Sequence, residues 1–77
     1  MPGPLTVHVA ARLKDAVEAQ GLTQAEVGVV IGQSQSQVSK YLRGEVSLDL
    51  EELAVLCRLL GLDAGTLVRE ALSDGAG

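Results

Sequence analysis

The chain has 77 residues and a formal net charge of −4 at pH 7, from 6 basic and 10 acidic side chains. This length allows one domain, close to the lower limit for folding without a metal or a disulfide, and the single Cys57 excludes an internal disulfide. The first residues, MPGPLTVHVAARLK, lack the basic start and apolar run of a signal peptide. No apolar stretch approaches the ~18 residues of a membrane span. We therefore expect a soluble, intracellular, cytoplasmic protein.

The charge is divided unevenly along the chain. Residues 1–44 carry four basic and three acidic side chains, whereas residues 45–77 carry two basic and seven acidic ones. An acidic protein argues against a nucleic-acid partner, but the acidity here belongs to one half. That half is interpreted either as a solvated face that keeps a small protein soluble, or as a surface that repels DNA or meets a basic partner.

The first predicted helix covers about residues 7–20. Thr6 is suited to cap its amino-terminal end, and Gly21 stands where a left-handed carboxy-terminal cap is expected. Its apolar side chains recur at helical spacing: Val9, Leu13, Ala16 and Val17.

The second predicted helix begins after Thr23 and ends near Val30, before Gly32. Thr23 and Glu26 have the spacing of a capping box, in which each side chain binds the backbone N–H of the other residue. The segment VGVVI within it has a high strand propensity, but the capping box in front of it favours a helix.

A run of five uncharged polar residues, Gln33–Gln37, follows that turn. Such a run is usual in a loop, but Ser34 and Gln37 repeat the spacing of a capping box. The run therefore predicts the first turn of a third helix, about residues 34–43, that ends before Gly44. Its inner face consists of Val38, Tyr41 and Leu42.

Two further helices are predicted in the second half of the chain. Ser47 is suited to cap the fourth helix and Asp63 the fifth. The apolar face of the fourth is Leu50, Leu53, Ala54, Cys57 and Leu60, and that of the fifth is Leu67, Val68, Ala71 and Leu72. The pattern predicts a compact all-α, five-helix domain over residues 6–73, with flexible ends at 1–5 and 74–77.

The second and third helices are short and joined by a tight turn, which is the arrangement of a helix-turn-helix. Gly28 lies in the middle of the second helix, where glycine costs about 1 kcal/mol relative to alanine. A glycine at that position indicates that the third helix crosses closely there.

The segment from Gln24 to Arg43 resembles the helix-turn-helix of the phage Cro/repressor family, also called the XRE family. The matching residues are Leu22-Thr23-Gln24-Ala25-Glu26-Val27-Gly28, then Gly32, Val38, Ser39 and Gly44. The resemblance covers about residues 9–72. It implies a lambda-repressor-like fold and sequence-specific binding to double-stranded DNA.

Two features depart from the family's pattern. The family often carries an ion pair between its first and third helices, where this chain has Val17 and Leu42. Replacing both partners of a buried pair is often neutral or stabilising, whereas losing one leaves an unpaired charge, so the double change indicates an apolar core variant. Gln33 occupies a turn position that the family usually fills with a small apolar residue.

Four side chains on the third helix are candidates for reading bases. In the family the amino-terminal end of this helix enters the major groove, where glutamine can pair with adenine, lysine with guanine, and serine with either. The residues that face away from the predicted core are Gln35, Ser36, Ser39 and Lys40.

Further residues are candidates for phosphate contacts. Gln24 resembles the family residue that binds a phosphate at the start of the second helix, and positive side chains supply sequence-independent affinity. Gln37 either caps its own helix or reaches the DNA backbone, and Tyr41 is expected in the core with its hydroxyl as a further phosphate donor. The set is Gln24, Gln37, Arg43, Lys14 and Arg12, each with surface solvation as the alternative.

No pattern indicates an enzyme, a metal site, a cofactor or a small-molecule ligand. His8 has no catalytic constellation near it in sequence, and Cys57 lies on an apolar stripe as a buried small hydrophobic residue. The resemblance implies a homodimer on a two-fold symmetric operator. The apolar stripe of residues 67–72 either packs within the domain or forms the dimer contact.

The sequence therefore predicts a sequence-specific transcriptional regulator, most similar to a compact repressor. The alternative is a protein-interaction module with the same fold, antitoxin-like or anti-regulator, that binds a partner through its acidic carboxy-terminal half.

Overall fold

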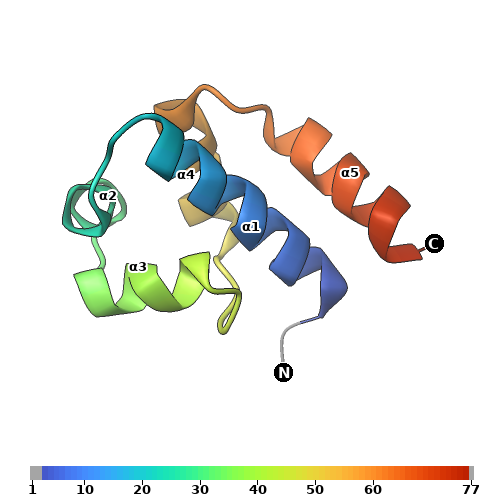
Figure 1. The fold of residues 1–77 in the computed structure, drawn as a ribbon, viewed down its shortest axis with the longest axis horizontal. Coiled ribbons are helices and arrows are strands. Elements are labelled where there is room, and N and C mark those ends of the chain that lie inside the picture. Colours follow the sequence, from blue (N-terminus) through green and yellow to red (C-terminus); the bar gives the residue numbers. More distant parts are fainter. Residues whose placement is uncertain (1–2, 77) are drawn as a thin grey trace.

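The computed structural model describes residues 3–76, with side chains described for residues 3–73, and consists there of five α-helices (Figure 1). They are α1 (Pro4–Ala19), α2 (Gln24–Ile31), α3 (Gln35–Leu42), α4 (Leu50–Leu60) and α5 (Ala64–Ala76). The predicted all-α, five-helix fold is confirmed. The expectation of flexible ends falls in part on residues 1, 2 and 77, which lie outside the described residues. Among the described helices, none has the length and apolarity that a membrane crossing requires.

Side-chain caps set the starts of α2 and α5 as predicted, whereas the capping box predicted for α3 is reduced to the bond that Ser34 accepts. Thr23 and Glu26 form the capping box of α2, with the Glu26 N–H donating to Thr23 Oγ1 (3.1 Å) and the Thr23 N–H donating to Glu26 Oε1 (2.9 Å). Ser34 Oγ accepts from the Gln37 N–H at α3 (3.1 Å), and Asp63 Oδ2 accepts a backbone N–H in α5 (2.8 Å). These bonds satisfy donors that have no partner within the helix.

Two predicted caps are wrong. The N-cap of α1 is Gly3 rather than Thr6, because the proline that follows has the φ that the first helical position requires. The N-cap of α4 is Asp49 rather than Ser47, and Asp49 forms a capping box with Glu52 (2.7 and 3.1 Å). The hydroxyls of Thr6 and Ser47 instead bind each other (3.0 Å), which ties the first turn of α1 to the loop before α4.

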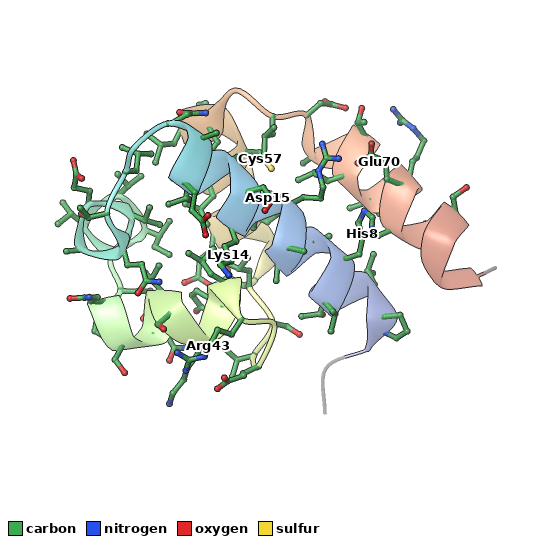
Figure 2. The ribbon with its side chains drawn as sticks, in the orientation of Figure 1. His8, Lys14, Asp15, Arg43, Cys57 and Glu70 are labelled. Atoms are coloured by element: carbon green, nitrogen blue, oxygen red, sulfur yellow. The ribbon has the colours of Figure 1, made fainter. Side chains whose placement is uncertain are left out.

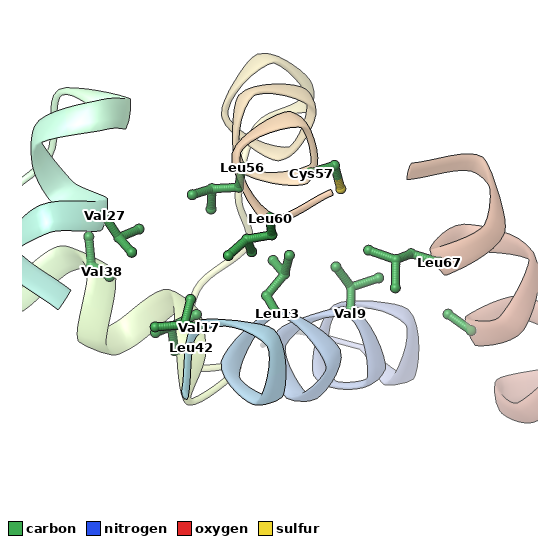
Figure 3. Close-up of a cluster of buried hydrophobic side chains, with 11 residues drawn as sticks. Val9, Leu13, Val17, Val27, Val38, Leu42, Leu56, Cys57, Leu60 and Leu67 are labelled. Atoms are coloured by element: carbon green, nitrogen blue, oxygen red, sulfur yellow. The ribbon is translucent and has the colours of Figure 1, made fainter. Parts of the chain in front are cut away.

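Side chains from all five helices form one aliphatic core (Figure 3). The face predicted for α4 is partly wrong, because Leu50 is 83% exposed and Ala54 is also exposed, whereas Leu56 is buried. The covered positions 53, 56, 57 and 60 follow the i, i+3, i+4, i+7 spacing of one helix face. The buried cluster is Val9, Leu13, Val17, Val27, Val38, Leu42, Leu56, Cys57, Leu60, Leu67 and Ala71.

The long helix α1 organises the domain. It contacts α3, α4 and α5, while α2 packs on α3 and α4. The helix-turn-helix, formed by α2 and α3, therefore lies on one side of α1, and α5 lies on the other (Figure 1). This arrangement leaves the outer face of α3 uncovered by the rest of the domain.

Gly28 permits the tight turn between α2 and α3. It is buried, and a Cβ added there would overlap the carbonyl oxygen of Gln33 and lie 3.5 Å from Val38 Cγ2. The Gln33 N–H also donates to the Gly28 carbonyl oxygen (2.9 Å). The predicted close approach is present, but the nearest neighbour is the backbone of the turn, and α3 contributes through Val38.

Candidate nucleic-acid interface

The short helix α3 separates its apolar and polar residues onto two faces. The buried side consists of the three residues predicted for it, Val38, Tyr41 and Leu42. The outward side carries the four candidate base-reading residues, with Ser39 half-buried and the other three exposed: Gln35, Ser36, Ser39 and Lys40. Burial of the apolar side thus turns the hydrogen-bonding side chains outward.

A shallow hollow on the surface joins α3 to the start of α2. It is lined by polar side chains, Gln24, Gln35, Ser36, Ser39 and Arg43. Gln24 is the first residue of α2, so the positive end of that helix dipole lies beside the polar face of α3. Candidates for base contacts and for phosphate contacts are therefore brought together in one place.

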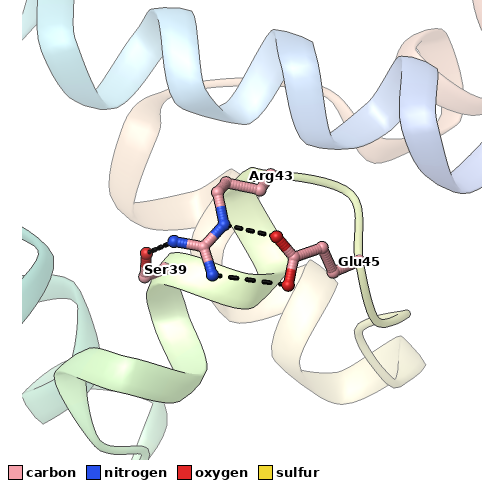
Figure 4. Close-up of polar contacts among 3 residues, drawn as sticks. All are labelled: Ser39, Arg43 and Glu45. Carbon is pink, nitrogen blue, oxygen red and sulfur yellow. Dashed lines mark hydrogen bonds and ion pairs between the residues drawn. The ribbon is translucent and has the colours of Figure 1, made fainter.

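Arg43, the C-cap of α3, is held by its neighbours. Its Nε and Nη2 donate to the carboxylate of Glu45, and its Nη1 donates to Ser39 Oγ (Figure 4). The bonds from Arg43 hold the pKa of Glu45 below its ordinary value, so the pair is charged at neutral pH. The sequence indicated a cation available to phosphate, and the structure places a carboxylate against it.

Arg12 lies away from the helix-turn-helix. Its Nη1 is 3.7 Å from Glu70 Oε1 of α5, and in Figure 2 Glu70 and Arg43 lie on opposite sides of α1. Arg12 therefore faces α5 rather than α3, because helical periodicity turns it to that side. We exclude it from the candidate interface.

Lys14 keeps a position on the helix-turn-helix side of α1. It is one helical turn beyond Ala10, which packs against Gly44 directly after α3. Lys14 is exposed, and its Nζ lies 3.9 Å from Glu18 Oε1. An exposed pair of this kind is weak, so the Lys14 ammonium group stays accessible to solvent beside Glu18.

Residues 8–71 match the family model described as a helix-turn-helix domain. The chain belongs to this helix-turn-helix family. It is 25% identical over 76 residues to an uncharacterized HTH-type transcriptional regulator of Sinorhizobium medicae, a match that covers 99% of this chain and 55% of the relative. This helix-turn-helix chain thus spans about half the length of the curated relatives it matches.

Solved structures share the fold of this helix-turn-helix domain. The clp gene regulator ClgR from Corynebacterium glutamicum superposes with a TM-score of 0.79 at 26% identity, over 94% of this chain and 77% of ClgR. The restriction-modification controller protein C.AhdI from Aeromonas hydrophila gives 0.70 at 26% identity, over 80% of this chain and 94% of C.AhdI. The predicted membership in a regulator-type helix-turn-helix family is confirmed.

An enzyme also contains a similar part. Hydroxypropylphosphonic acid epoxidase from S. wedmorenis gives a TM-score of 0.71 at 27% identity, but the match covers 80% of this chain and only 33% of the enzyme. The likeness is therefore to one portion of that protein. It shows that this helix-turn-helix fold also occurs within larger chains.

Glu52 of α4 binds two residues of the helix-turn-helix from within the domain. Its carboxylate accepts from the Tyr41 hydroxyl (3.0 Å to each oxygen), from Gln33 Nε2 (2.9 Å) and from the Asp49 N–H (3.1 Å). Tyr41 is therefore a core residue as predicted, but its hydroxyl binds Glu52 and is not directed to a phosphate. The unusual Gln33 at the turn has a structural partner in the same carboxylate.

The pKa of Tyr41 reflects this environment. A side-chain hydrogen bond with Gln37 acts to lower it, but burial, the bond to Glu52 and the charges of Glu52 and Asp49 together raise the pKa above its ordinary value. Gln37 is half-buried and turned toward Tyr41 one turn later. The predicted cap by the Gln37 side chain is not formed, since among the described residues at the start of α3 only the Gln37 N–H bonds to Ser34. The predicted contact to the DNA backbone stays a prediction.

The apolar stripe of α5 is divided between the core and the surface. Leu67 and Ala71 are 2% and 1% exposed and belong to the core, so they are corrected from dimerisation candidates to packing residues. Val68 is half-buried and Leu72 is 55% exposed. The part of the stripe that remains accessible is centred on Leu72.

Sequence reasoning missed the roles of Glu45 and Glu52, which it had included in the acidic half of the chain. For Glu52, the D-x-x-E spacing from Asp49 is a capping-box signal. For Glu45, the signal is its place directly after Gly44, where a left-handed glycine turns the chain back over the end of a helix.

Proposed function

We propose that this domain binds double-stranded DNA as part of a transcriptional regulator, with α3 in the major groove. The observation that carries the proposal is the polar hollow that joins the start of α2 to the outward face of α3. Family membership supports it, because helix-turn-helix proteins insert the second helix into the major groove and cross the backbone with the first.

The roles of the side chains follow from their chemistry. Gln35 can pair with adenine through two hydrogen bonds, Ser36 and Ser39 can donate or accept, and Lys40 can reach guanine. Gln24 at the start of α2 would hold a phosphate with the help of that helix end. Lys14 would add positive charge on the same side, and Arg43 would do so where a phosphate displaces Glu45, with Gln37 as a secondary backbone contact.

In more detail, we propose that the regulator is a repressor that acts in the cytoplasm and is associated with the nucleoid when it is bound to DNA. It would bind as a homodimer to a two-fold symmetric operator. Two recognition helices on one axis would contact half-sites about one helical turn apart, ~34 Å. Leu72, with the half-buried Val68 beside it, is the part of α5 on which a second copy would pack. No catalytic role is proposed.

The test of DNA binding is a salt titration of affinity combined with a footprint on duplexes selected from random DNA. A dimer that contacts about six phosphates is expected to give a log–log slope near −5, although the chain is acidic, because each contact contributes roughly −0.9. Protection should fall on one face of the duplex. A salt-independent affinity, or no footprint at low salt, would favour the protein-interaction module instead.

Alanine at Gln35 or Lys40 is expected to weaken binding to the selected duplex by about 1–3 kcal/mol and to relax the choice of base at one position. Both side chains are exposed, so the melting temperature should hardly change. Repeating the selection with each variant measures the preference directly. Arg12→Ala, which removes a positive charge on the α5 side, is the control and should leave binding nearly unchanged.

A further inference from the structure

The position of Glu45 is fixed by the backbone cap that ends α3. The Gly44 N–H donates to the Tyr41 carbonyl oxygen (3.0 Å) and the Glu45 N–H donates to the Lys40 carbonyl oxygen (3.0 Å), which are the two bonds of a Schellman cap. Gly44 has φ +72° and lies against α1, where an added Cβ would be 3.4 Å from Val7 Cα. Glu45 is therefore turned back over the end of α3 whether or not its side chain makes a bond.

The side chain at this fixed position binds one edge of the Arg43 guanidinium, through Nε and Nη2. Each guanidinium nitrogen makes one bond, since Nε and Nη2 donate to Glu45 and Nη1 donates to Ser39 Oγ (Figure 4). These bonds use three of the five N–H donors. The guanidinium is thus held in one orientation against Ser39, in the wall of the polar hollow. Both charged side chains are about half exposed, and exposed ion pairs add little to stability, so the contact chiefly sets where Arg43 points.

A DNA phosphate would seek the same guanidinium nitrogens that the carboxylate already holds. Binding to arbitrary DNA depends on phosphate contacts, and a phosphate can reach this face of Arg43 only by displacing Glu45 or by approaching its negative charge. Sequence is read instead by side chains that contact base edges, and such contacts need side chains that their neighbours hold in place. A carboxylate at this place therefore weakens binding to the phosphates of arbitrary DNA and does not weaken recognition through bases.

We propose that Glu45 is a specificity-determining residue of the DNA-binding face, which keeps Arg43 on Ser39 and withholds it from phosphates of arbitrary sequence. The inference rests on the proposed function and deepens it. Its direct consequence is that removing the carboxylate strengthens binding to duplexes of arbitrary sequence, and so reduces discrimination between the selected and other sequences.

The test compares Glu45→Gln with Glu51→Gln, since both remove one negative charge. Glu51 is exposed in the first turn of α4 and serves as the matched control, whereas Glu52 is unsuitable because it braces Tyr41. Affinities are measured by fluorescence anisotropy for a selected duplex and for a scrambled duplex of the same composition. Circular dichroism checks that each variant keeps its helices.

Glu45→Gln is expected to raise affinity for the scrambled duplex on the order of tenfold, the effect of one added phosphate contact, and to lower the ratio of selected to scrambled affinity by a similar factor. Glu51→Gln should raise both affinities slightly and leave their ratio unchanged. In an Arg43→Gln background, Glu45→Gln should behave like the control.

Two results would overturn the inference, and they differ in what else they overturn. If the parent protein binds DNA but Glu45→Gln leaves the ratio at the parent value, Glu45 has no part in specificity and the proposed function stands. If the parent protein binds no duplex even at low salt, the proposed function and the inference both fail.

Discussion

Replacing Leu42 by glutamate is expected to lower the free energy of unfolding by about 3–5 kcal/mol, because it places an unpaired charge in the core. Leu42 is 5% exposed and Val17 is 4% exposed, and both belong to the one buried cluster (Figure 3). A domain of this size has roughly 4–12 kcal/mol of stability, so the loss is a large fraction of the total. Urea denaturation followed by circular dichroism measures the loss.

Adding Val17→Arg to Leu42→Glu is expected to recover a good part of the loss, since it restores the ion pair that the family often carries at these two places. A double variant no more stable than Leu42→Glu would show that the two side chains do not meet. Leu50→Glu is the control, because Leu50 is 83% exposed at the start of α4, where a negative charge is favourable. The deficit of Leu42→Glu should also shrink at acid pH, because burial raises the pKa of a carboxyl and favours its neutral form.

Gly28→Ala is expected to destabilise the domain by roughly 1–3 kcal/mol, which is the usual cost of forcing an extra carbon into packed structure. The new methyl group would overlap the Gln33 carbonyl oxygen, a backbone atom of the turn that cannot rotate away. The clash opposes a gain of about 1 kcal/mol in helix propensity. Denaturation midpoints and the affinity for the selected duplex should fall together, because the turn sets the angle between α2 and α3.

Gly65→Ala is the matched control for Gly28→Ala. Gly65 lies in the first turn of α5, where an added Cβ would be 3.4 Å from the Asp63 carboxylate and 3.5 Å from the Arg69 guanidinium. These are ordinary contacts with flexible side chains. The substitution is therefore expected to leave stability unchanged or to raise it by up to about 1 kcal/mol. If Gly28→Ala stabilises the domain as well, the turn is not as tight as described.

The sequence signals that predicted the structure correctly were those whose geometry depends only on residues close together in the chain. The Thr23–Glu26 box and the Asp63 cap are each satisfied within four residues of chain, so their geometry does not depend on the rest of the fold. The same holds for the outward face of α3, since its three apolar residues leave only one way to bury the helix. Ser47 failed as a cap because Asp49, two residues later, competes for the same role with Glu52 as its reciprocal partner.

Tertiary structure decided every case in which a residue's role depended on a partner distant in sequence or on a turn of the chain. Arg12 and Lys14 are nearly adjacent in sequence, yet one faces α5 and the other the end of α3. Leu67 and Leu72 share a predicted stripe, but only Leu67 is buried in the core. Composition cannot distinguish such residues, because burial is set by which helices pack together.

The sequence by itself determined the number of helices, the helix-turn-helix and the hydrogen-bonding character of α3, because short segments of chain specify helical periodicity and caps. The family followed from the resemblance of residues 24–43 to a known helix-turn-helix. Only the tertiary structure brought Gln24 to the same hollow as Ser39, set Glu45 on Arg43, and gathered Tyr41 and Gln33 on the carboxylate of Glu52. These contacts join separate elements or depend on the left-handed turn at Gly44, and no pattern within one helix specifies them. The physical reason is that the partner of a polar or charged side chain is whichever group the folded chain places within hydrogen-bond distance of it.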